Sequence, residues 1–419
     1  MPSAVIVIAA VLTPSSELRS NQGDIGLYLE KARALVSGLV PYRDVHFEYP
    51  PVALVPMVVP YLLWPFGPVS LETYRWLFAG WEAGLMFALA IVLARVVRLG
   101  ATVDVEGRQA GDPVRSMATR LIVVTIGAAL AITFRYDLYP AVLVMVALWA
   151  ALERRPSVVG VAIALGVLAK LYPLAVVPAL AIPFLAPFDL RALVRYGLSF
   201  GLTIGLVLAP FLVLAGDDTF AFLRYQGERG LEIESIGAGL AMLSGLLSGQ
   251  PVGQSYGFSA VQVTGPFAEA WLAALPVATF VGFGLIAWLG WRRIRLGPVT
   301  PATVVAFAFA SVLMLLVTSK VFSIQYVVWI VPFAALISGR RFWLAALILA
   351  LTMPIHPILF GDLVDQAALP ILVLNVRNGL LLVLTAWVIA DLRPSGVGAR
   401  RTPPTVVSRA DSAPATDSG

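Results

Sequence analysis

The sequence predicts an all-α polytopic membrane protein in which about twelve transmembrane helices form a bundle. Of the 419 residues, 59% are hydrophobic and only 13% are charged, against about a quarter charged in soluble domains. The mean hydropathy is +0.88. Apolar runs of roughly 20 residues, the length that crosses about 30 Å of hydrocarbon, recur along the whole chain. Residues 1–392 are therefore expected to form a single transmembrane domain.

A polar segment, Asn21 to Pro51, interrupts this apolar pattern early in the chain. Apolar side chains recur from Ile25 with the spacing of one face of an amphipathic helix. Asp24 stands before this helix as a candidate N-cap, and Gly38 follows its end. We expect the helix to lie in the membrane interface, the chain after it to run extended, and residues 52–66 to form a partial or interfacial helix.

The remaining apolar runs predict the transmembrane helices in order. They are expected at about 4–13, 74–97, 119–134, 138–152, 157–169, 173–187, 196–215, 268–290, 301–318, 324–338, 342–355 and 371–390. Residues 157–187 can be read as two short spans or as one long broken span. Two spans are preferred, because a single span would move every later arginine cluster to the outer side of the membrane.

Arginine placement predicts the orientation in the plasma membrane. Links between apolar runs on one side hold most of the 29 basic residues, and such links favour the cytoplasm. Both termini are therefore expected in the cytoplasm, with a first outer loop at 15–66 and a large outer loop at 216–266. Shorter outer corners fall at 135–137, 170–173, 319–326 and 356–378. Residues 393–419 contain no core-forming pattern and are expected to be a disordered cytoplasmic tail.

Composition excludes several kinds of site. The chain has no cysteine, so it has no disulfide, thiol nucleophile or thiolate metal site. Its two histidines, His46 and His356, exclude a histidine-rich metal site. The net charge of +5 does not indicate nucleic-acid binding, because the arginines are spread in pairs between apolar runs rather than gathered on one face. No metal or other cofactor is expected, and no nucleic-acid partner.

Three motifs on the predicted outer side carry a family resemblance. The first, G-x-x-P-Y-x-D-x-x-F-x-Y-P-P, comprises Gly38, Pro41, Tyr42, Asp44, Phe47, Tyr49, Pro50 and Pro51. The second, K-x-Y-P, comprises Lys170, Tyr172 and Pro173, and the third, S-K-V-F-S-x-Q-Y-x-x-W, comprises Ser319, Lys320, Val321, Phe322, Ser323, Gln325, Tyr326 and Trp329. Together they resemble glycosyltransferase family 87, the polyprenol-phosphate-mannose-dependent α-mannosyltransferases of the GT-C superfamily.

This resemblance implies a GT-C-like bundle and a membrane glycosyltransferase. The enzyme would move a sugar, mannose in that family, from a polyprenyl-phosphate donor to a glycolipid or lipid-linked glycan on the outer face of the membrane. A phosphatidylinositol mannoside or a lipomannan is the kind of acceptor that the family suggests, and the residues are compatible with others. Membrane lipids would be its further partners.

The reaction needs a base for the proton of the acceptor hydroxyl. In the family this base is an aspartate in the first outer loop, and Asp24 occupies that place. From residue chemistry alone, Asp24 is more simply the cap of the helix that follows. Asp44 and Glu48 are possible substitutes, and each is otherwise an ordinary loop carboxylate.

Two further sets of residues are candidates for substrate contacts. The leaving phosphate needs fixed cations, and the cationic candidates at the outer boundary are Arg135, Lys170, Arg229, Lys320 and Arg377. Each of them alone is more often an interface anchor. The candidates for binding the sugars are Tyr28, Tyr42, Asp44, Glu48, Tyr49 and Gln325, although aromatic residues are also common at membrane interfaces.

A transporter or lipid flippase is the alternative function. It would need charged groups near the middle of the membrane on broken helices, often in paired repeats. The predicted spans contain few such groups, Glu82 among them, and no convincing repeat. The enzyme and the transporter can be told apart by geometry. An enzyme should bring Asp24 and the outer basic residues together at one cavity at the outer boundary of the membrane.

Overall fold

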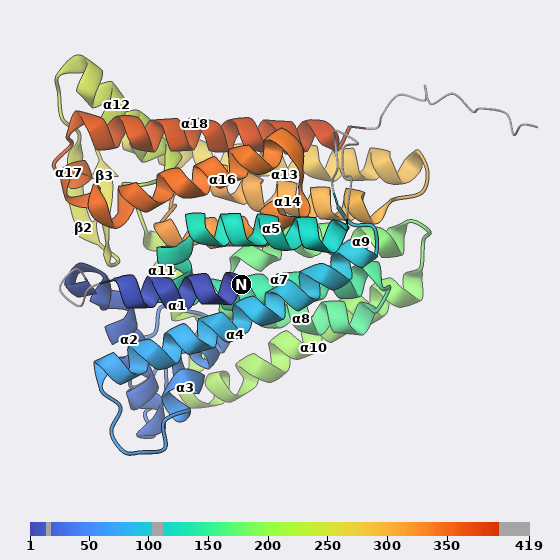
Figure 1. Ribbon diagram of the computed structural model, residues 1–419, viewed down its shortest axis with the longest axis horizontal. Helices are drawn as coiled ribbons and strands as arrows, with labels where there is room; N and C mark the ends of the chain where they lie inside the picture. Colours follow the sequence, from blue (N-terminus) through green and yellow to red (C-terminus); the bar gives the residue numbers. More distant parts are fainter. Residues whose placement is uncertain (14–17, 103–111, 394–419) are drawn as a thin grey trace, which may run out of the picture.

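The chain folds as a bundle of long helices with a layer of short helices and strands at one end (Figure 1). The computed structural model describes residues 1–13, 18–102 and 112–393, so the predicted tail, apart from its first residue, lies outside them. Within that part of the chain, five helical segments are long and apolar enough to cross a membrane: Leu71–Arg98, Leu190–Glu228, Pro266–Arg295, Gly339–Ile358 and Ala368–Asp391. Shorter apolar helices pack among them. The predicted class, an all-α polytopic membrane protein, is confirmed.

The helices of the bundle follow the predicted spans closely. The first half contains α1 (Pro2–Leu12), α4 (Leu71–Arg98), α5 (Pro113–Gly127), α6 (Ala129–Phe134), α7 (Leu138–Leu152), α8 (Pro156–Ala169), the 3-10 helix η2 (Tyr172–Val176), α9 (Val177–Leu185) and α10 (Leu190–Ala215). The second half contains α13 (Pro266–Arg295), α14 (Pro301–Val317), the 3-10 helix η4 (Ile324–Trp329), α15 (Val331–Leu336), α16 (Gly339–Met353), the π-helix η5 (Pro354–Ile358), α17 (Phe360–Val364) and α18 (Ala368–Asp391). Each predicted span coincides with one of these helices or with a consecutive pair.

Helices α8 and α9 run in opposite directions. Arg154, just before α8, donates a hydrogen bond to the carbonyl oxygen of Pro183 near the end of α9 and lies 3.6 Å from Asp189. Lys170 follows the far end of α8, a full helix length away. The chain therefore crosses the bundle and returns between these points, which confirms two short segments in residues 157–187.

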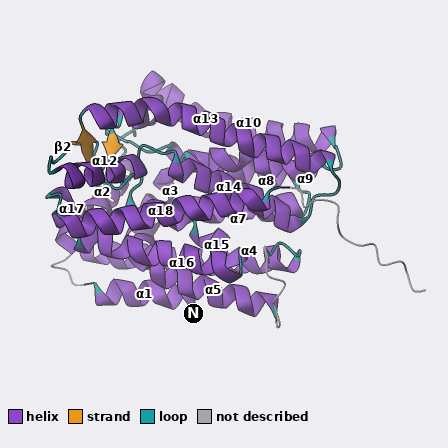
Figure 2. Cartoon of the chain, turned by 90° about the horizontal axis from the view of Figure 1, so that it is seen from above, coloured by secondary structure: helices purple, strands orange, loops and turns teal. Residues whose placement is uncertain are grey.

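The core is densest around α14 and α15, which are apolar and buried around almost their whole circumference. Helix α10 differs, because it packs mainly on α8 and presents most of its leucines outward. The contact with α8 depends on Gly160, where a Cβ would clash with Tyr196 and Ser199. Such close approach at a small residue is typical of helix pairs in membranes. In Figure 2, α10 and α13 occupy one long side of the bundle, and α1 and α5 the opposite side.

The helix in the first polar segment begins earlier than predicted. Helix α2 covers Leu18–Val36, so Asp24 lies inside it, and the interpretation of Asp24 as the N-cap is wrong. The predicted end is close to the observed one. Gly38 follows with a φ of +90°, and the amide of Leu39 donates to the carbonyl of Ala34 at 3.0 Å, a pattern in which glycine is favoured.

The chain then makes a turn and re-enters the bundle. Tyr42 N–H donates to the carbonyl of Val45 at 3.0 Å, and residues 46–50 form neither helix nor strand. The 3-10 helix η1 (Pro51–Ala53) and α3 (Leu54–Leu62) follow, as expected of a partial helix within residues 52–66.

Residues 216–266 form a cap over the same end of the bundle. They contain the 3-10 helix η3 (Gly216–Phe220), α11 (Ala221–Glu228), β1 (Leu231–Glu232), α12 (Ile236–Ser248), β2 (Gly253–Gly257) and β3 (Ala260–Thr264). The strands form an antiparallel sheet in the order β1-β3-β2. Phe258 and Ser259 join β2 to β3, and their φ angles of 54° and 56° are those of a type I′ turn. Because neither residue is glycine, this turn is strained, which is a feature found at functional sites.

Candidate functional site

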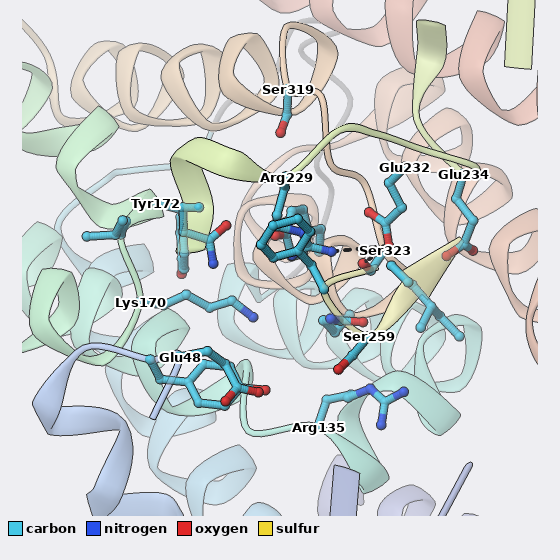
Figure 3. Close-up of a pocket in the computed structure, with 18 of the residues that line it drawn as sticks. Glu48, Arg135, Lys170, Tyr172, Arg229, Glu232, Glu234, Ser259, Ser319 and Ser323 are labelled. Atoms are coloured by element: carbon cyan, nitrogen blue, oxygen red, sulfur yellow. Dashed lines mark hydrogen bonds and ion pairs between the residues drawn. The ribbon is translucent and has the colours of Figure 1, made fainter. Parts of the chain in front are cut away.

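One cavity of about 900 Å³ lies where the cap meets the helix ends. Its wall is assembled from segments that are far apart in the sequence: α2, the residues before α7, the break after α8, the cap, and the residues that follow α14 and α16. These are the segments that were predicted to lie on one side of the membrane. Figure 3 shows the labelled polar side chains converging on this space from several sides.

Asp24 and Arg135 form an ion pair in the cavity wall. The distance from Arg135 Nη1 to Asp24 Oδ2 is 2.8 Å, and the two side chains are 13% and 30% exposed. Asp24 lies in α2, whereas Arg135 has an extended backbone conformation and follows the end of α6. The carboxylate is therefore held at the cavity by a fixed cation, and Arg135 is already occupied by a carboxylate.

Lys170 is held by a second, deeper pair. Its Nζ lies 2.6 Å from Oδ1 of Asp137, and the same oxygen accepts a hydrogen bond of 2.7 Å from Trp329 Nε1. Aromatic rings surround the ammonium group, with ring centroids at 5.1 Å for Tyr136 and Tyr326. Burial lowers the pKa of Lys170 and raises that of Asp137, and their mutual attraction opposes both shifts. All three family motifs thus have a member in the cavity wall, because Tyr49 also lines it.

The cap contributes a third charged group. Arg229 lines the cavity and lies 3.8 Å from Oε1 of Glu232, which also accepts a hydrogen bond from Ser323 Oγ. Glu234, two residues further on, lines the cavity as well. Burial, together with the negative charge of Glu232, raises the pKa of Glu234 to about 8. The site thus has cationic residues on several walls and a pair of carboxyl groups on the wall formed by the cap.

Another part of the cavity is apolar. It is lined by side chains from η2, α13 and α14 and from the residue before η2, namely Leu171, Leu174, Ala175, Phe283 and Leu315. Leu174 is 54% exposed, so this part reaches the outer surface of the bundle. The cavity as a whole suits a ligand with a charged head and a hydrocarbon tail.

Seven of the predicted site residues line this cavity, and they come from six different segments. They are Asp24, Glu48, Tyr49, Arg135, Lys170, Arg229 and Gln325. Glu48 is 8% exposed, and Nε2 of His46 lies 4.0 Å from its carboxylate. The cavity therefore offers two carboxylates from the first polar segment, Asp24 and Glu48.

The other predicted site residues lie outside the lining. Tyr28 and Tyr42 are buried among aromatic rings, and Tyr42 donates a hydrogen bond to the carbonyl of Tyr49. Asp44 is bound by Arg43 and by the amide of Val40, and these contacts lower its pKa to about 2.

Lys320 and Arg377 also have partners away from the cavity. Lys320 donates to the carbonyl of Gly227 at 2.7 Å, and Arg377 is fully buried. Arg377 Nη2 donates to the carbonyl of Glu234 at 2.8 Å, and its guanidinium lies 4.2 Å from the ring centroid of Phe322. In this structure both side chains support the backbone of the cap rather than the cavity surface.

Several lining residues were not singled out from the sequence. Asp137, which does not line the cavity but pairs with Lys170, was also missed, although it adjoins the polar corner Arg135-Tyr136. Glu232 and Glu234 lie in a stretch that reads as a solvated charged loop. Their spacing of two residues, alternating with Leu231 and Ile233, was the overlooked signal, because it is typical of a strand.

Among the described residues, no group of three or more histidine, aspartate or glutamate side chains is arranged to hold a metal ion. The chemistry that the cavity can support with its own side chains is proton transfer at a carboxylate next to stabilisation of an anion by lysine and arginine.

Comparisons with known proteins give only distant likenesses. No model of a known protein family matches the sequence, and no curated protein sequence matches it. Two crystal structures of ArnT from Cupriavidus metallidurans share similarity of fold. The one bound to undecaprenyl phosphate is 13% identical, covers 93% of this chain and 76% of its own, and has a TM-score of 0.46. The apo structure is 15% identical, covers 88% and 72%, and has a TM-score of 0.45. At these TM-scores neither similarity supports assigning an activity to this chain. The resemblance to family 87 and the GT-C-like arrangement stay predictions.

Proposed function

We propose that this protein is a membrane glycosyltransferase that moves a sugar from a polyprenyl-phosphate donor to a hydroxyl group of a lipid-linked glycan. The observation that carries the proposal is the convergence of Asp24, Lys170 and Arg229 on one cavity with an apolar arm. A base, an anion site and a path for a lipid tail are the three parts that this reaction needs.

The donor phosphate is assigned to Lys170 and Arg229. Both cations line the cavity, and the aromatic rings beside Lys170 exclude water, which strengthens a charge-assisted contact. Arg135 has a different part, because its partner is Asp24, the proposed base, and a phosphate bound there would lie on the same side as the base. The prenyl chain extends from the phosphate along Leu171, Leu174 and the other apolar lining residues.

The transfer is a single displacement at the anomeric carbon. The acceptor oxygen forms a bond to that carbon as the bond to the phosphate oxygen breaks, and the acceptor proton passes to the carboxylate of Asp24. The electron pair of the broken bond leaves with the polyprenyl phosphate, whose charge Lys170 and Arg229 stabilise. For a β-linked mannosyl donor, as the family resemblance suggests, the product is α-linked, and no covalent enzyme intermediate is needed.

Glu48 is the second candidate for the base. It lines the same cavity, and in the described part of the chain its contact with a basic side chain, His46 at 4.0 Å, is longer than the 2.8 Å contact of Asp24 with Arg135. Asp24 is preferred because an ion pair fixes its position, and general-base catalysis depends on geometry first. Asp44 is set aside because Arg43 engages its carboxylate outside the cavity.

One observation favours the alternative of a transporter or lipid flippase. Glu82 lies inside α4 with 0% exposure, and neither of its carboxyl oxygens has a hydrogen-bond partner. A buried carboxyl group in a membrane helix is a feature of proton-coupled transport. Glu82 stands apart from the cavity lining, however, whereas the other charged candidates gather at one end of the bundle.

The test is transfer by the purified protein in lipid nanodiscs. Radiolabelled polyprenyl-phosphate mannose and polyprenyl-phosphate glucose are offered separately with a lipid extract as acceptor, and the Asp24→Asn protein serves as the matched control. Label should appear in a larger glycolipid, with release of an equal amount of polyprenyl phosphate. If the folded protein transfers no label from any donor but moves donor across liposome membranes, the transporter function replaces this proposal.

A further inference from the structure

Two glutamates at the cap wall of the cavity each have an oxygen atom without a partner. Glu232 and Glu234 are 5% and 4% exposed, and both line the cavity. Oε1 of Glu232 is engaged by Ser323 and Arg229, but Glu232 Oε2 and Glu234 Oε1 have no hydrogen-bond partner. Because buried polar atoms are normally hydrogen-bonded, this wall is suited to a ligand that brings donors.

The backbone holds the two carboxyl groups rigidly. The amide of Glu232 donates to the carbonyl of Lys320 and the amide of Ile233 to the carbonyl of Val261, each at 3.0 Å. The amide of Ser235 donates to the carbonyl of Glu232 at 2.9 Å, so the chain turns directly after β1 and Glu234 lies in that turn. Figure 3 shows Glu232 and Glu234 next to each other on one side of the pocket, with Glu48 and Lys170 on another.

Aromatic surface from the cap lies in the same cavity. Tyr225 and Phe258 line it, with ring centroids 5.2 Å apart, and the hydroxyl of Tyr225 donates to the carbonyl of Phe258 at 2.8 Å. The strained turn that carries Phe258 also brings Ser259 into the lining. Carboxyl groups beside an aromatic face fit a sugar ring, which has hydroxyl groups at its edge and apolar C–H groups on its faces.

We propose that Glu232 and Glu234, with Tyr225, Phe258 and Ser259, form the subsite that binds the acceptor as a sugar ring with neighbouring hydroxyl groups. This inference rests on the proposed function. The carboxyl pair repels a phosphate, so the donor head group belongs on the Lys170 side of Arg229, whose guanidinium lies 3.8 Å from Glu232 and screens its charge. The sugar bound at the cap is then the one that accepts. The acceptor residue is accordingly uncharged and lies away from any phosphate of its own lipid.

Hydroxyl groups fit this pair better than a cation does. Burial and the charge of Glu232 raise the pKa of Glu234 to about 8, so one proton remains on the pair at neutral pH. A protonated and an ionised carboxyl together both donate and accept hydrogen bonds, as a hydroxyl group requires. A metal ion or an amine would have to displace that proton, and the described residues offer no third carboxylate or histidine in metal-binding geometry.

The test uses Glu234→Gln, which keeps the size and the neutral character of the protonated side chain. Glu228→Gln is the control, because Glu228 lies in the same cap but is exposed and outside the lining. The acceptor probes are methyl α-D-mannopyranoside, methyl α-D-glucopyranoside and their monodeoxy analogues. In Glu234→Gln the KM for the acceptor glycoside should rise about 3- to 10-fold, with the donor KM unchanged, as for a lost hydrogen bond. One deoxy analogue should be a poorer acceptor for the wild type but not for the variant.

Binding without transfer separates this inference from the proposed function. The better methyl glycoside at millimolar concentration should raise the melting temperature of the wild type and of Glu228→Gln more than that of Glu234→Gln. If the wild type transfers sugar but Glu234→Gln changes only the donor KM, the pair binds the donor and the inference is overturned. An activity that requires added Mg²⁺ in the wild type and loses this requirement in the variant would assign the pair to a cation instead. If Glu234→Gln does not fold, Phe258→Ala must show the same acceptor effect.

Discussion

Replacing Asp24 by asparagine should abolish sugar transfer while leaving the fold and the donor affinity almost unchanged. The substitution removes the proton acceptor but keeps the size of the side chain. Since Asp24 lies inside α2, its replacement cannot act by removing a helix cap. Asp24→Asn therefore separates the chemistry from the folding of the first polar segment.

The expected magnitudes follow from the geometry of the pair with Arg135. Loss of a general base lowers the rate by about 10² to 10⁴. The contact of 2.8 Å joins side chains that are 30% and 13% exposed, so it lies between a surface pair and a buried one. After screening by solvent, its loss should lower the free energy of unfolding by only about 1 to 2 kcal/mol.

A double-mutant cycle with Arg135→Gln measures the coupling. Arg135 acts through Asp24 as a positioning residue, so Arg135→Gln alone should lower kcat by about tenfold without raising the donor KM. The double variant should be no slower than Asp24→Asn alone, because Arg135 has no base left to position. Asp44→Asn, outside the cavity, should transfer normally.

The assay is single-turnover transfer from radiolabelled donor in nanodiscs, with thermal unfolding measured on the same samples. Near-normal transfer by Asp24→Asn would show that Asp24 is not the base and would direct the search to Glu48. Equal and mild losses in Asp24→Asn and Arg135→Gln would show that the pair is only structural.

Three other predictions concern the donor site, the topology and the cap. Lys170→Met should raise the donor KM about 10- to 100-fold, because it removes a charge-assisted contact. Lys320→Met should change the donor KM little, since Lys320 binds a backbone carbonyl outside the cavity lining. Titration of the donor in transfer assays compares the two variants. Single cysteines at the exposed positions Ser37 and Ser248 should react with an impermeant thiol reagent in intact cells, with the cysteine-free parent protein as control. Labelling that appears only after lysis would reverse the predicted orientation. The pKa of Glu234 is raised to about 8 in the folded protein, so the folded state holds a proton that the unfolded state releases. The free energy of unfolding should therefore fall as the pH rises from about 5 to about 8. Thermal unfolding of Glu234→Gln should not show this decline.

The bundle could be predicted from the sequence because its signal is local. Each apolar run is long enough to identify a helix, and arginine pairs such as Arg154-Arg155 mark the links between helices. Even the broken region at 157–187 was divided correctly, since only two spans keep the arginine clusters on one side.

The beginning of α2 was placed too late because two local signals both favoured a start at Asp24. Asp24 before an apolar periodic stretch is a good N-cap pattern, and Asn21 and Gly23 just before it are poor helix formers. The structure continues the helix through these residues to Leu18. The partner of Asp24 could not be read from the sequence, because Arg135 approaches it only through the packing of separate helices.

The acidic wall of the cavity was missed for a different reason. The stretch from Arg229 to Ser235 is rich in charge, and charge normally indicates exposure to water. The structure buries this stretch on both sides. Strand β1 and the turn after it place Leu231 and Ile233 in a hydrophobic cluster and Glu232 and Glu234 at the cavity. The alternation of residue types, which is typical of a strand, was not used as a signal here, and only the tertiary structure shows that the two glutamates are enclosed.

The buried pair of Lys170 and Asp137 has one more consequence, which comes from helix dipoles. Asp137 is the N-cap of α7, where the dipole presents a partial positive charge, and Lys170 is the C-cap of α8, where the partial charge is negative. Each ionised side chain therefore has an opposite partial charge beside it as well as its partner at 2.6 Å. These fixed charges favour the ionised forms without help from water, so a lipid that dries the cavity on entry leaves the cation in place. Added salt, which screens exposed pairs within about 10 Å at 0.1 M, should have little effect on this one.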